Sequence, residues 1–246
     1  DAVVLIGWSD AHIGKSRIFS DVVKAAAAAL DRFDGVLIGA EPTSASTAYG
    51  YIESIAGTGD GDVKHQVAPI QSFHEKPRLD IAESYLRRGG FAWNTGISVW
   101  RASRLLELFR MLTPAHYVAL DRIRGALGTD REERVTAQTL EGLERTAIDQ
   151  SIFERAANFG TVTADFGWSD VGSWEALYDI GADRDKSLIR GNVVALKTRD
   201  CLLESSNKLL AVYGVEDLVV VETDQVVLVT RKSLSANLKE IYEEVR

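Results

Sequence analysis

The chain has 246 residues, of which 46% are hydrophobic and 26% are charged, and its formal net charge is -8. This composition is typical of a folded globular chain, and the acidic balance argues against a nucleic-acid partner, since that function needs clustered lysines and arginines. No apolar run approaches the ~20 residues of a membrane span, and the single cysteine, Cys201, excludes a disulfide framework, so we expect a cytoplasmic protein without a membrane partner.

The first two-thirds of the chain alternates strand-like and helix-like segments. Residues 2–6 form a continuous apolar run that predicts a buried central strand. Further strands are expected at residues 36–39, 49–55, 63–74, 97–100 and 162–165, with a Gly/Asp-rich hairpin turn at 57–62. Helices are expected at residues 19–33, 80–88, 102–127, 135–158 and 174–180. This alternation predicts an α/β fold with a mixed or parallel sheet covered by helices.

The composition changes near Lys186. Short β-rich segments then recur at a spacing of roughly eight to ten residues, and a closing helix is expected at 234–245. These segments are residues 193–196, 201–204, 209–213, 218–222 and 226–230. We therefore predict an α/β domain at 1–187 and a small β-rich C-terminal domain at 188–246. Exposed strand edges in the second domain would favour a homodimer.

The N-terminus is unusual for a domain boundary. The chain begins at Asp1, and its one methionine is Met111. Because a domain seldom opens with its central strand, we expect further residues upstream of Asp1. The α/β domain is therefore predicted to be N-terminally incomplete in this chain.

Two aspartates lie in turns that contain glycine. Asp10 belongs to G-W-S-D-A-H at 7–12, after the first predicted strand, and Asp170 belongs to G-W-S-D-V-G-S-W at 167–174. Ligands of open α/β sheets bind at the carboxyl ends of strands, and lone carboxylates suit a hard cation such as Mg²⁺. The alternative is a pair of solvated turns, since Asp, Ser and Gly are ordinary turn formers.

A second group of motifs carries polar residues suited to a sugar phosphate. Glu75 and Lys76 stand in F-H-E-K-P at 73–77 and could supply a hydroxyl acceptor and a phosphate-binding cation. Because neighbours on an extended chain point to opposite sides, we do not expect the two residues to form a surface ion pair of the usual helical kind. The alternative is two solvated charges at the end of a strand.

Asn94 and Gly50 complete this group. Asn94 stands in W-N-T-G-I at 93–97, and its amide offers both donors and an acceptor for sugar hydroxyls. Gly50 lies between two tyrosines in P-T-S-A-S-T-A-Y-G-Y-I at 42–52, where its backbone could contact a ligand. The alternatives are a turn leading into strand 97–100 for the first motif and a glycine that faces a packed neighbour for the second.

The order of these motifs, together with A-I-D-Q-S-I-F-E at 147–154 and G-V-E-D-L-V-V-V-E-T-D at 214–224, resembles that of the sugar-1-phosphate nucleotidyltransferases. The resemblance runs along the whole chain and is greatest to the mannose-1-phosphate guanylyltransferase branch. It implies a Rossmann-like catalytic domain followed by a small β-rich domain. It also implies that mannose 1-phosphate attacks the α-phosphorus of GTP, which forms GDP-mannose and releases pyrophosphate.

The resemblance also implies roles for individual residues. Asp10 and Asp170 would hold Mg²⁺ against the phosphates, and Lys76 would meet the sugar phosphate. Glu75, Asn94 and the Gly50 backbone would bind the mannose hydroxyls. Asp10, Asp170 and Lys76 are therefore the expected catalytic residues, whereas Asp149 lies in a matching motif without an assigned role.

The chain departs from the family pattern in three places. The glycine-rich signature G-G-x-G-T-R-L-x-P is absent from the 246 residues, and the family's P-A-D-H reads Trp8-Ser9-Asp10-Ala11. In the E-T-G-Y-G loop, Ser46 replaces the glutamate and Ala48 replaces the first glycine. These departures leave an alternative function open, that of a catalytically inactive relative which binds or regulates a partner.

Overall fold

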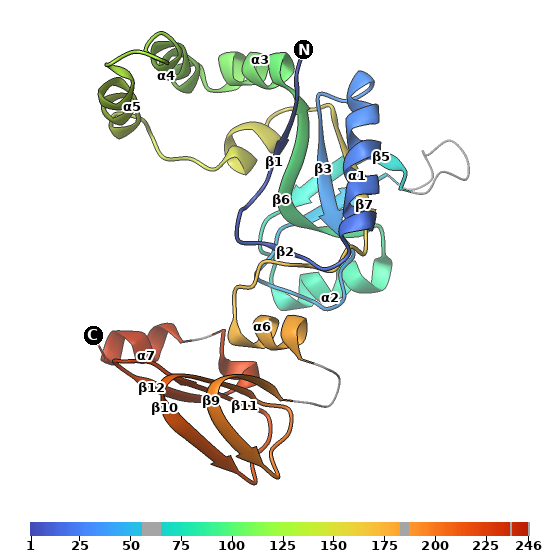
Figure 1. Ribbon diagram of the computed structural model, residues 1–246. Coiled ribbons are helices and arrows are strands. Elements are labelled where there is room, and N and C mark those ends of the chain that lie inside the picture. The colour runs from blue at the N-terminus through green and yellow to red at the C-terminus, as the bar shows by residue number, and fades with distance from the viewer. Residues whose placement is uncertain (56–64, 183–186, 237, 246) are drawn as a thin grey trace. The chain divides into compact units, whose positions relative to one another are not determined.

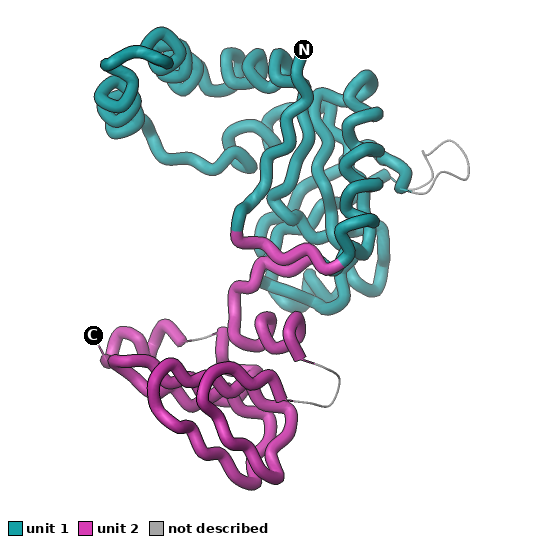
Figure 2. The backbone as a smooth tube through the Cα atoms, viewed as in Figure 1, with its two compact units in different colours: residues 1–9, 15–167 teal, residues 10–14, 168–246 magenta. Residues whose placement is uncertain are grey.

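The computed structural model describes residues 1–55, 65–182, 187–236 and 238–245 (Figure 1). The chain divides into two compact units, of which unit 1 is Asp1–Ser9 with Lys15–Gly167 and unit 2 is Asp10–Gly14 with Trp168–Arg246 (Figure 2). The turn predicted at 57–62 lies outside the described residues, and the domain boundary near residue 187 stays a prediction. No helix in the described ranges is long and apolar enough to cross a membrane.

Unit 1 is built on a six-stranded sheet in the order β1-β6-β3-β7-β5-β4. Its strands are β1 (Val3–Ile6), β3 (Gly35–Ala40), β4 (Tyr51–Ser54), β5 (Val67–His74), β6 (Phe91–Arg101) and β7 (Phe159–Ala164). The β3–β7 pair is parallel and the other pairings are antiparallel, so the sheet is mixed. Strand β4 also pairs with β6, which closes a ring of five strands and leaves β1 attached outside it.

The expectation of a buried central strand at 2–6 is wrong. Among the described strands, β1 pairs with β6 alone, and Val3 and Leu5 are about half exposed. A continuous apolar run shows that a segment suits a strand. It does not determine how many strands flank that segment, because the neighbours come from distant parts of the sequence.

Most helices of unit 1 are shorter than predicted. They are α1 (Ser16–Ala28), η1 (Ala29–Asp31), α2 (Leu79–Arg88), α3 (Ala102–Leu112), α4 (Pro114–Arg124), α5 (Glu132–Glu141) and η2 (Asp149–Phe153). The helix predicted at 102–127 divides at Thr113, whose φ of -137° and ψ of 63° are not helical. Pro114 explains this break, because a proline disfavours the helical conformation of the residue before it.

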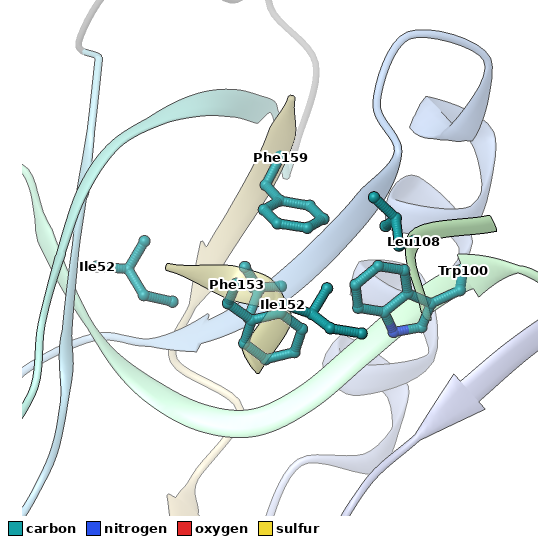
Figure 3. Packing of buried hydrophobic residues seen from close by; sticks show 7 residues of the cluster. Ile52, Trp100, Leu108, Ile152, Phe153 and Phe159 are labelled. Atoms are coloured by element: carbon teal, nitrogen blue, oxygen red, sulfur yellow. The ribbon is translucent and has the colours of Figure 1, made fainter. Parts of the chain in front are cut away.

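An aromatic cluster fills the core of unit 1. The Trp100 indole stacks on Phe153 with their ring centroids 5.5 Å apart, and the Phe159 ring meets it edge-on (Figure 3). The buried Trp100 indole donates a 2.8 Å hydrogen bond to the Ser98 hydroxyl, so its polar atom is satisfied. Ile152 and Phe153 of η2 thereby fix that short helix against β6.

Unit 2 contains a four-stranded sheet in the order β12-β11-β10-β9. Its elements are β9 (Leu188–Leu196), β10 (Leu202–Tyr213), β11 (Leu218–Glu222), β12 (Val227–Arg231), α6 (Trp174–Gly181), η3 (Lys232–Leu234) and α7 (Lys239–Glu244). Strands β9, β10 and β11 run parallel, and their buried apolar residues stack in register, as in the Leu202–Val219 pair. A small pair of strands, β2 (His12–Ile13) and β8 (Trp168–Ser169), also belongs to this unit.

A buried carboxylate shapes the middle of β10. The strands predicted at 201–204 and 209–213 form one strand whose register shifts between Ser205 and Leu210. Here Glu222 Oε2 accepts hydrogen bonds from the Ser205 hydroxyl and from the backbone N–H groups of Ser206, Asn207 and Lys208. These backbone donors hold the pKa of Glu222 below its ordinary value, although burial opposes them.

We predict that Glu222→Gln destabilises the protein at pH 7. Gln carries no charge, and its NH₂ group would take the position of Glu222 Oε1. That position is buried and has no hydrogen-bond partner among the described residues, so the NH₂ group would be left unsatisfied. Because the folded pKa lies below the ordinary value of 4.5, the wild-type advantage is fully present above about pH 4.5 and is lost as the pH falls through the folded pKa. Urea unfolding at pH 7 and at pH 3 measures this; an equal difference at both values would contradict it.

Candidate functional site

The W-N-T-G motif forms an irregularity inside strand β6, so the alternative interpretation, a turn leading into a strand at 97–100, is wrong. Ile38 of β3 pairs with Ile97, and the next pair is Gly39 with Asn94. Thr95 and Gly96 therefore have no partner in β3, which is a bulge in the ladder. Such bulges re-aim side chains and are over-represented next to active sites.

Each residue of the motif has a physical role in this bulge. The Thr95 hydroxyl donates a 2.6 Å bond to the Ile38 carbonyl and accepts a 3.2 Å bond from the Ile97 N–H, so it replaces ladder bonds. The Asn94 Oδ1 atom accepts a bond from the Gly96 N–H at 3.1 Å. Gly96 has a φ of +70°, which favours glycine.

Gly50, Glu75 and Asn94 lie together beside this bulge. The Asn94 N–H donates a 2.7 Å hydrogen bond to the Gly50 carbonyl. A Cβ atom at Gly50 would lie 2.7 Å from Glu75 Oε2 and 3.1 Å from the Phe73 ring. Gly50 therefore faces packed neighbours, as the alternative interpretation expected. One of these neighbours is the carboxylate of Glu75, which is itself a predicted site residue.

Lys76 does not point away from Glu75 as an extended chain would require. Its φ of +42° turns the backbone, and its Nζ atom lies 3.6 Å from Glu75 Oε1. The expectation that the two side chains point to opposite sides is therefore wrong, and they form an ion pair that is not of the helical kind. Both are substantially exposed, so this pair contributes little stability and remains open to an anion.

A hydrogen-bonded carboxylate anchors the strands that carry these residues. Glu53 of β4 accepts a 2.7 Å bond from the Ser72 hydroxyl of β5 and a 2.8 Å bond from the Arg88 guanidinium of α2. The Ser72 bond, together with His74 and Arg88, lowers the pKa of Glu53 against the effect of burial. This network fixes the end of β5, from which Glu75 and Lys76 extend.

Two contacts of this region were not predicted. The Asn94 amide donates a 3.0 Å hydrogen bond to Asp149 Oδ1 at the start of η2. The exposed Trp8 indole lies against Gly96, where a Cβ atom would come within 1.9 Å of Nε1. The sequence indicated the contact of Asp149, because this residue stood in a family-like motif without an assigned role. Nothing in the sequence indicated the contact between Trp8 and Gly96.

Asp10 and Asp170 belong to unit 2, where a short antiparallel ladder brings their segments together. His12 pairs with Ser169 and Ile13 with Trp168, so the residues before His12 run beside those after Ser169. Asp170 Oδ1 accepts a 3.2 Å bond from the Gly172 N–H, and Val171 has a φ of +51°. Both carboxylates are exposed.

The donor set at these two aspartates fits Mg²⁺. In the described ranges, no three His, Cys, Asp or Glu side chains are grouped closely enough to hold a metal ion. Mg²⁺ is usually bound by one or two carboxylates together with substrate phosphates and water. Two exposed carboxylates on adjacent segments are consistent with that mode of binding, and they do not resemble a closed metal cage.

One hollow of unit 1 lies apart from the predicted residues. It has a volume of about 490 Å³ and is lined by residues of β3, β5, η2 and β7, among them Leu37, Ile70, Phe73, Phe153 and Phe159. None of the predicted site residues lines it. The predicted sugar-binding residues of unit 1 lie beside the bulge, and this hollow, whose lining also includes Gln71, Ser72 and Glu154, contains none of them.

The sequence matches known families over nearly its whole length. Residues 1–187 match the family model described as "Nucleotidyl transferase", and residues 191–245 match "MannoseP isomerase/GMP-like beta-helix domain". The chain belongs to the nucleotidyl transferase family. The parallel strands of unit 2 agree with a β-helix-like domain after the nucleotidyltransferase domain.

Curated relatives with sequence similarity carry several names. The chain is 34% identical over 248 residues to the "Xanthan biosynthesis protein XanB" of Xanthomonas campestris pv. campestris (strain B100), which covers 100% of this chain and 51% of that protein. It is 31% identical over 251 residues to the "Mannose-1-phosphate guanylyltransferase ManC" of Salmonella typhimurium (strain LT2), and this match covers 100% of this chain and 52% of that protein. The chain therefore spans about half the length of the curated relatives it matches.

Solved structures show the same fold. The "mannose-1-phosphate geranyltransferase" of Thermus thermophilus matches with a TM-score of 0.80 and 29% identity, covering 99% of this chain and 69% of that one. The "mannose-6-phosphate isomerase" of Helicobacter pylori matches with a TM-score of 0.55 and 22% identity, covering 68% and 63%. At that identity, the second likeness concerns the fold alone.

We predict that Gly96→Ala destabilises the protein more than Gly128→Ala. The two glycines have nearly equal φ values of +70° and +72°, but a Cβ atom meets Trp8 at Gly96 and nothing within 4 Å at Gly128. An alanine held at positive φ costs about 1–2 kcal/mol, and the clash with Trp8 raises the loss at Gly96 to about 2–3 kcal/mol. Urea unfolding measures both, and equal losses would contradict the contact with Trp8.

Proposed function

We propose that this chain is the catalytic part of a mannose-1-phosphate guanylyltransferase. Three residues that the resemblance assigned to one sugar, Gly50, Glu75 and Asn94, come from separate segments, and Gly50 lies against both of the others beside the β6 bulge. That convergence carries the proposal. Membership of the nucleotidyl transferase family and relatives with that name support it.

The proposed reaction joins two phosphorylated substrates. A phosphate oxygen of mannose 1-phosphate attacks the α-phosphorus of GTP, the bond to the β-phosphate breaks, and GDP-mannose and pyrophosphate are formed. The protein does little covalent work in such a transfer, and it acts by positioning the reactants and stabilising charge.

The residues of unit 1 would bind the sugar phosphate. Glu75 would accept hydrogen bonds from mannose hydroxyls, and the Asn94 carboxamide would donate and accept them. The Lys76 ammonium would meet the phosphate as a point charge. It is exposed, and its pair with Glu75 is weak, so it is available to bind a phosphate.

Asp10 and Asp170 would hold Mg²⁺, which is the metal proposed for this chain. When bound, the ion would neutralise charge on the phosphates of the nucleotide. The two carboxylates would orient that charge, and the bond from the Gly172 N–H would fix the Asp170 side chain in its turn.

The proposed function is tested by pyrophosphate release from the purified protein with GTP, mannose 1-phosphate and Mg²⁺. We expect release that needs all three components and produces GDP-mannose. Binding of mannose 1-phosphate without any release would favour the alternative, an inactive binding or regulatory relative. The specific observation behind that alternative is Ser46, which stands where the family pattern has a glutamate. The Ser46 backbone N–H and carbonyl both bond to the Tyr51 hydroxyl.

A homodimer through the C-terminal domain and a cytoplasmic location remain part of this proposal. Strand β9 is one of the two outer strands of the unit 2 sheet, and it exposes Val194 and Leu196 beside Tyr213 of β10. Apolar side chains on an exposed edge favour association.

We predict that Lys76→Ala raises the KM for mannose 1-phosphate by about 10- to 100-fold, because a charged hydrogen bond to the phosphate is lost. The KM for GTP should change little. Initial rates at varied concentrations of each substrate measure this. Lys24→Ala, another exposed lysine in unit 1, is the control, and equal changes in both KM values would contradict the role of Lys76.

We predict that Asp170→Asn lowers kcat by about 100-fold or more while the protein stays folded, because a metal ligand of the transition state is weakened. Activity titrated with Mg²⁺ and thermal unfolding measure the two effects. The control is Asp179→Asn, which changes an exposed carboxylate of α6. An unaltered rate would remove Asp170 from the metal site.

A further inference from the structure

Asp149 is the one chemistry-bearing residue at the bulge that the proposed mechanism does not use. It begins η2, whose Ile152 and Phe153 are buried in the aromatic core. Its side chain is therefore held by the rigid part of unit 1. Its Oδ1 atom accepts the 3.0 Å bond from Asn94 Nδ2.

The Asn94 carboxamide is fixed at both ends by this arrangement. Its Oδ1 atom accepts from the Gly96 N–H at 3.1 Å, and its Nδ2 group donates to Asp149. A carboxamide can turn by half a rotation at small cost, which exchanges its donor and its acceptor. Here a backbone donor at one end and an acceptor-only carboxylate at the other allow one orientation.

The fixed orientation leaves defined groups for a ligand. Among the contacts of the described residues, one Nδ2 proton and one Oδ1 lone pair of Asn94 have no protein partner. The Asn94 backbone N–H bonds to the Gly50 carbonyl, and Gly50 in turn lies against Glu75, so the candidate sugar-binding residues adjoin this carboxamide. A pre-oriented donor and acceptor bind a hydroxyl pair better than a rotating amide does.

We propose that Asp149 is a positioning residue that orients the Asn94 carboxamide for the sugar hydroxyls, an inference that rests on the proposed function. Asp149 acts through Asn94, and it stabilises the sugar phosphate complex without contacting the nucleotide.

The test is a double-mutant cycle in pyrophosphate release with mannose 1-phosphate and GTP. Asp149→Leu should raise the KM for mannose 1-phosphate about tenfold and leave the KM for GTP unchanged. Asp149→Asn keeps an oxygen acceptor and should restore the KM to within about threefold. Glu154→Leu, a carboxylate at the end of the same helix without a bond to Asn94, is the control.

The Asn94→Ala background separates positioning from direct contact. In that background Asp149→Leu should have no further effect, because the group it orients is gone. A further tenfold loss there, or no loss in the wild-type background, would overturn the proposal. We also expect Asp149→Leu to have a thermal unfolding temperature close to that of the Glu154→Leu control. A change in KM that is explained by lost stability alone would overturn the proposal.

Nitrogen-15 NMR of the Asn94 side-chain amide distinguishes failure of this inference from failure of the proposed function. Asp149→Leu should shift the amide signals and speed their exchange with water. An amide that Asp149→Leu leaves unchanged overturns the positioning role. If instead the amide shifts but the wild-type protein is never saturated by mannose 1-phosphate, the proposed function is overturned.

Discussion

Two residues of β6 without a partner in β3, Thr95 and Gly96, are the constraint on which the candidate site depends. The ladder can tolerate them because the Thr95 hydroxyl makes the bonds that the backbone loses. Gly96 supplies the left-handed backbone that the insertion requires. As a result, the Asn94 amide turns toward Gly50 and Asp149, and residues from four distant segments meet.

The bulge matters because β6 has more neighbouring strands than any other strand among the described residues. It pairs with β1, β3 and β4, and its Trp100 side chain lies at the centre of the aromatic core. The buried Trp100 anchors one end of β6, and this anchored strand carries Asn94 toward its other end. A site on such a strand is held more precisely than a site on a free loop. Unit 2 uses a related device, since Glu222 satisfies the unpaired backbone groups at the register shift of β10.

The sequence predicted the types of most elements but not their neighbours. The apolar alternation and the turn residues were sufficient for the mixed α/β class and for the β-rich end of the chain. These patterns did not predict where a strand lies within its sheet, because the edge position of β1 depends on which distant strands pair. Pro114 could have divided the long helix at 102–127, and the register shift of β10 could not have been found from residues 201–213, since its cause is Glu222.

The candidate site was predicted as a set of residues, and its geometry was not. Gly50, Glu75 and Asn94 stood in separate motifs, and only the resemblance joined them before their contacts were known. Local sequence was misleading at Lys76, where a left-handed backbone brings its ammonium to Glu75. It was silent about the bond between Asn94 and Asp149, because hydrogen bonds between residues 55 positions apart depend on the tertiary fold.

The most direct test of the central claim is calorimetric titration of the wild-type protein with mannose 1-phosphate and, separately, with inorganic phosphate. If the bulge builds a sugar phosphate site, mannose 1-phosphate binds with one-to-one stoichiometry and at least about tenfold more tightly than phosphate, since hydroxyl contacts add to the charge of Lys76. Equal affinity for both ligands, or no binding of mannose 1-phosphate, would contradict the account.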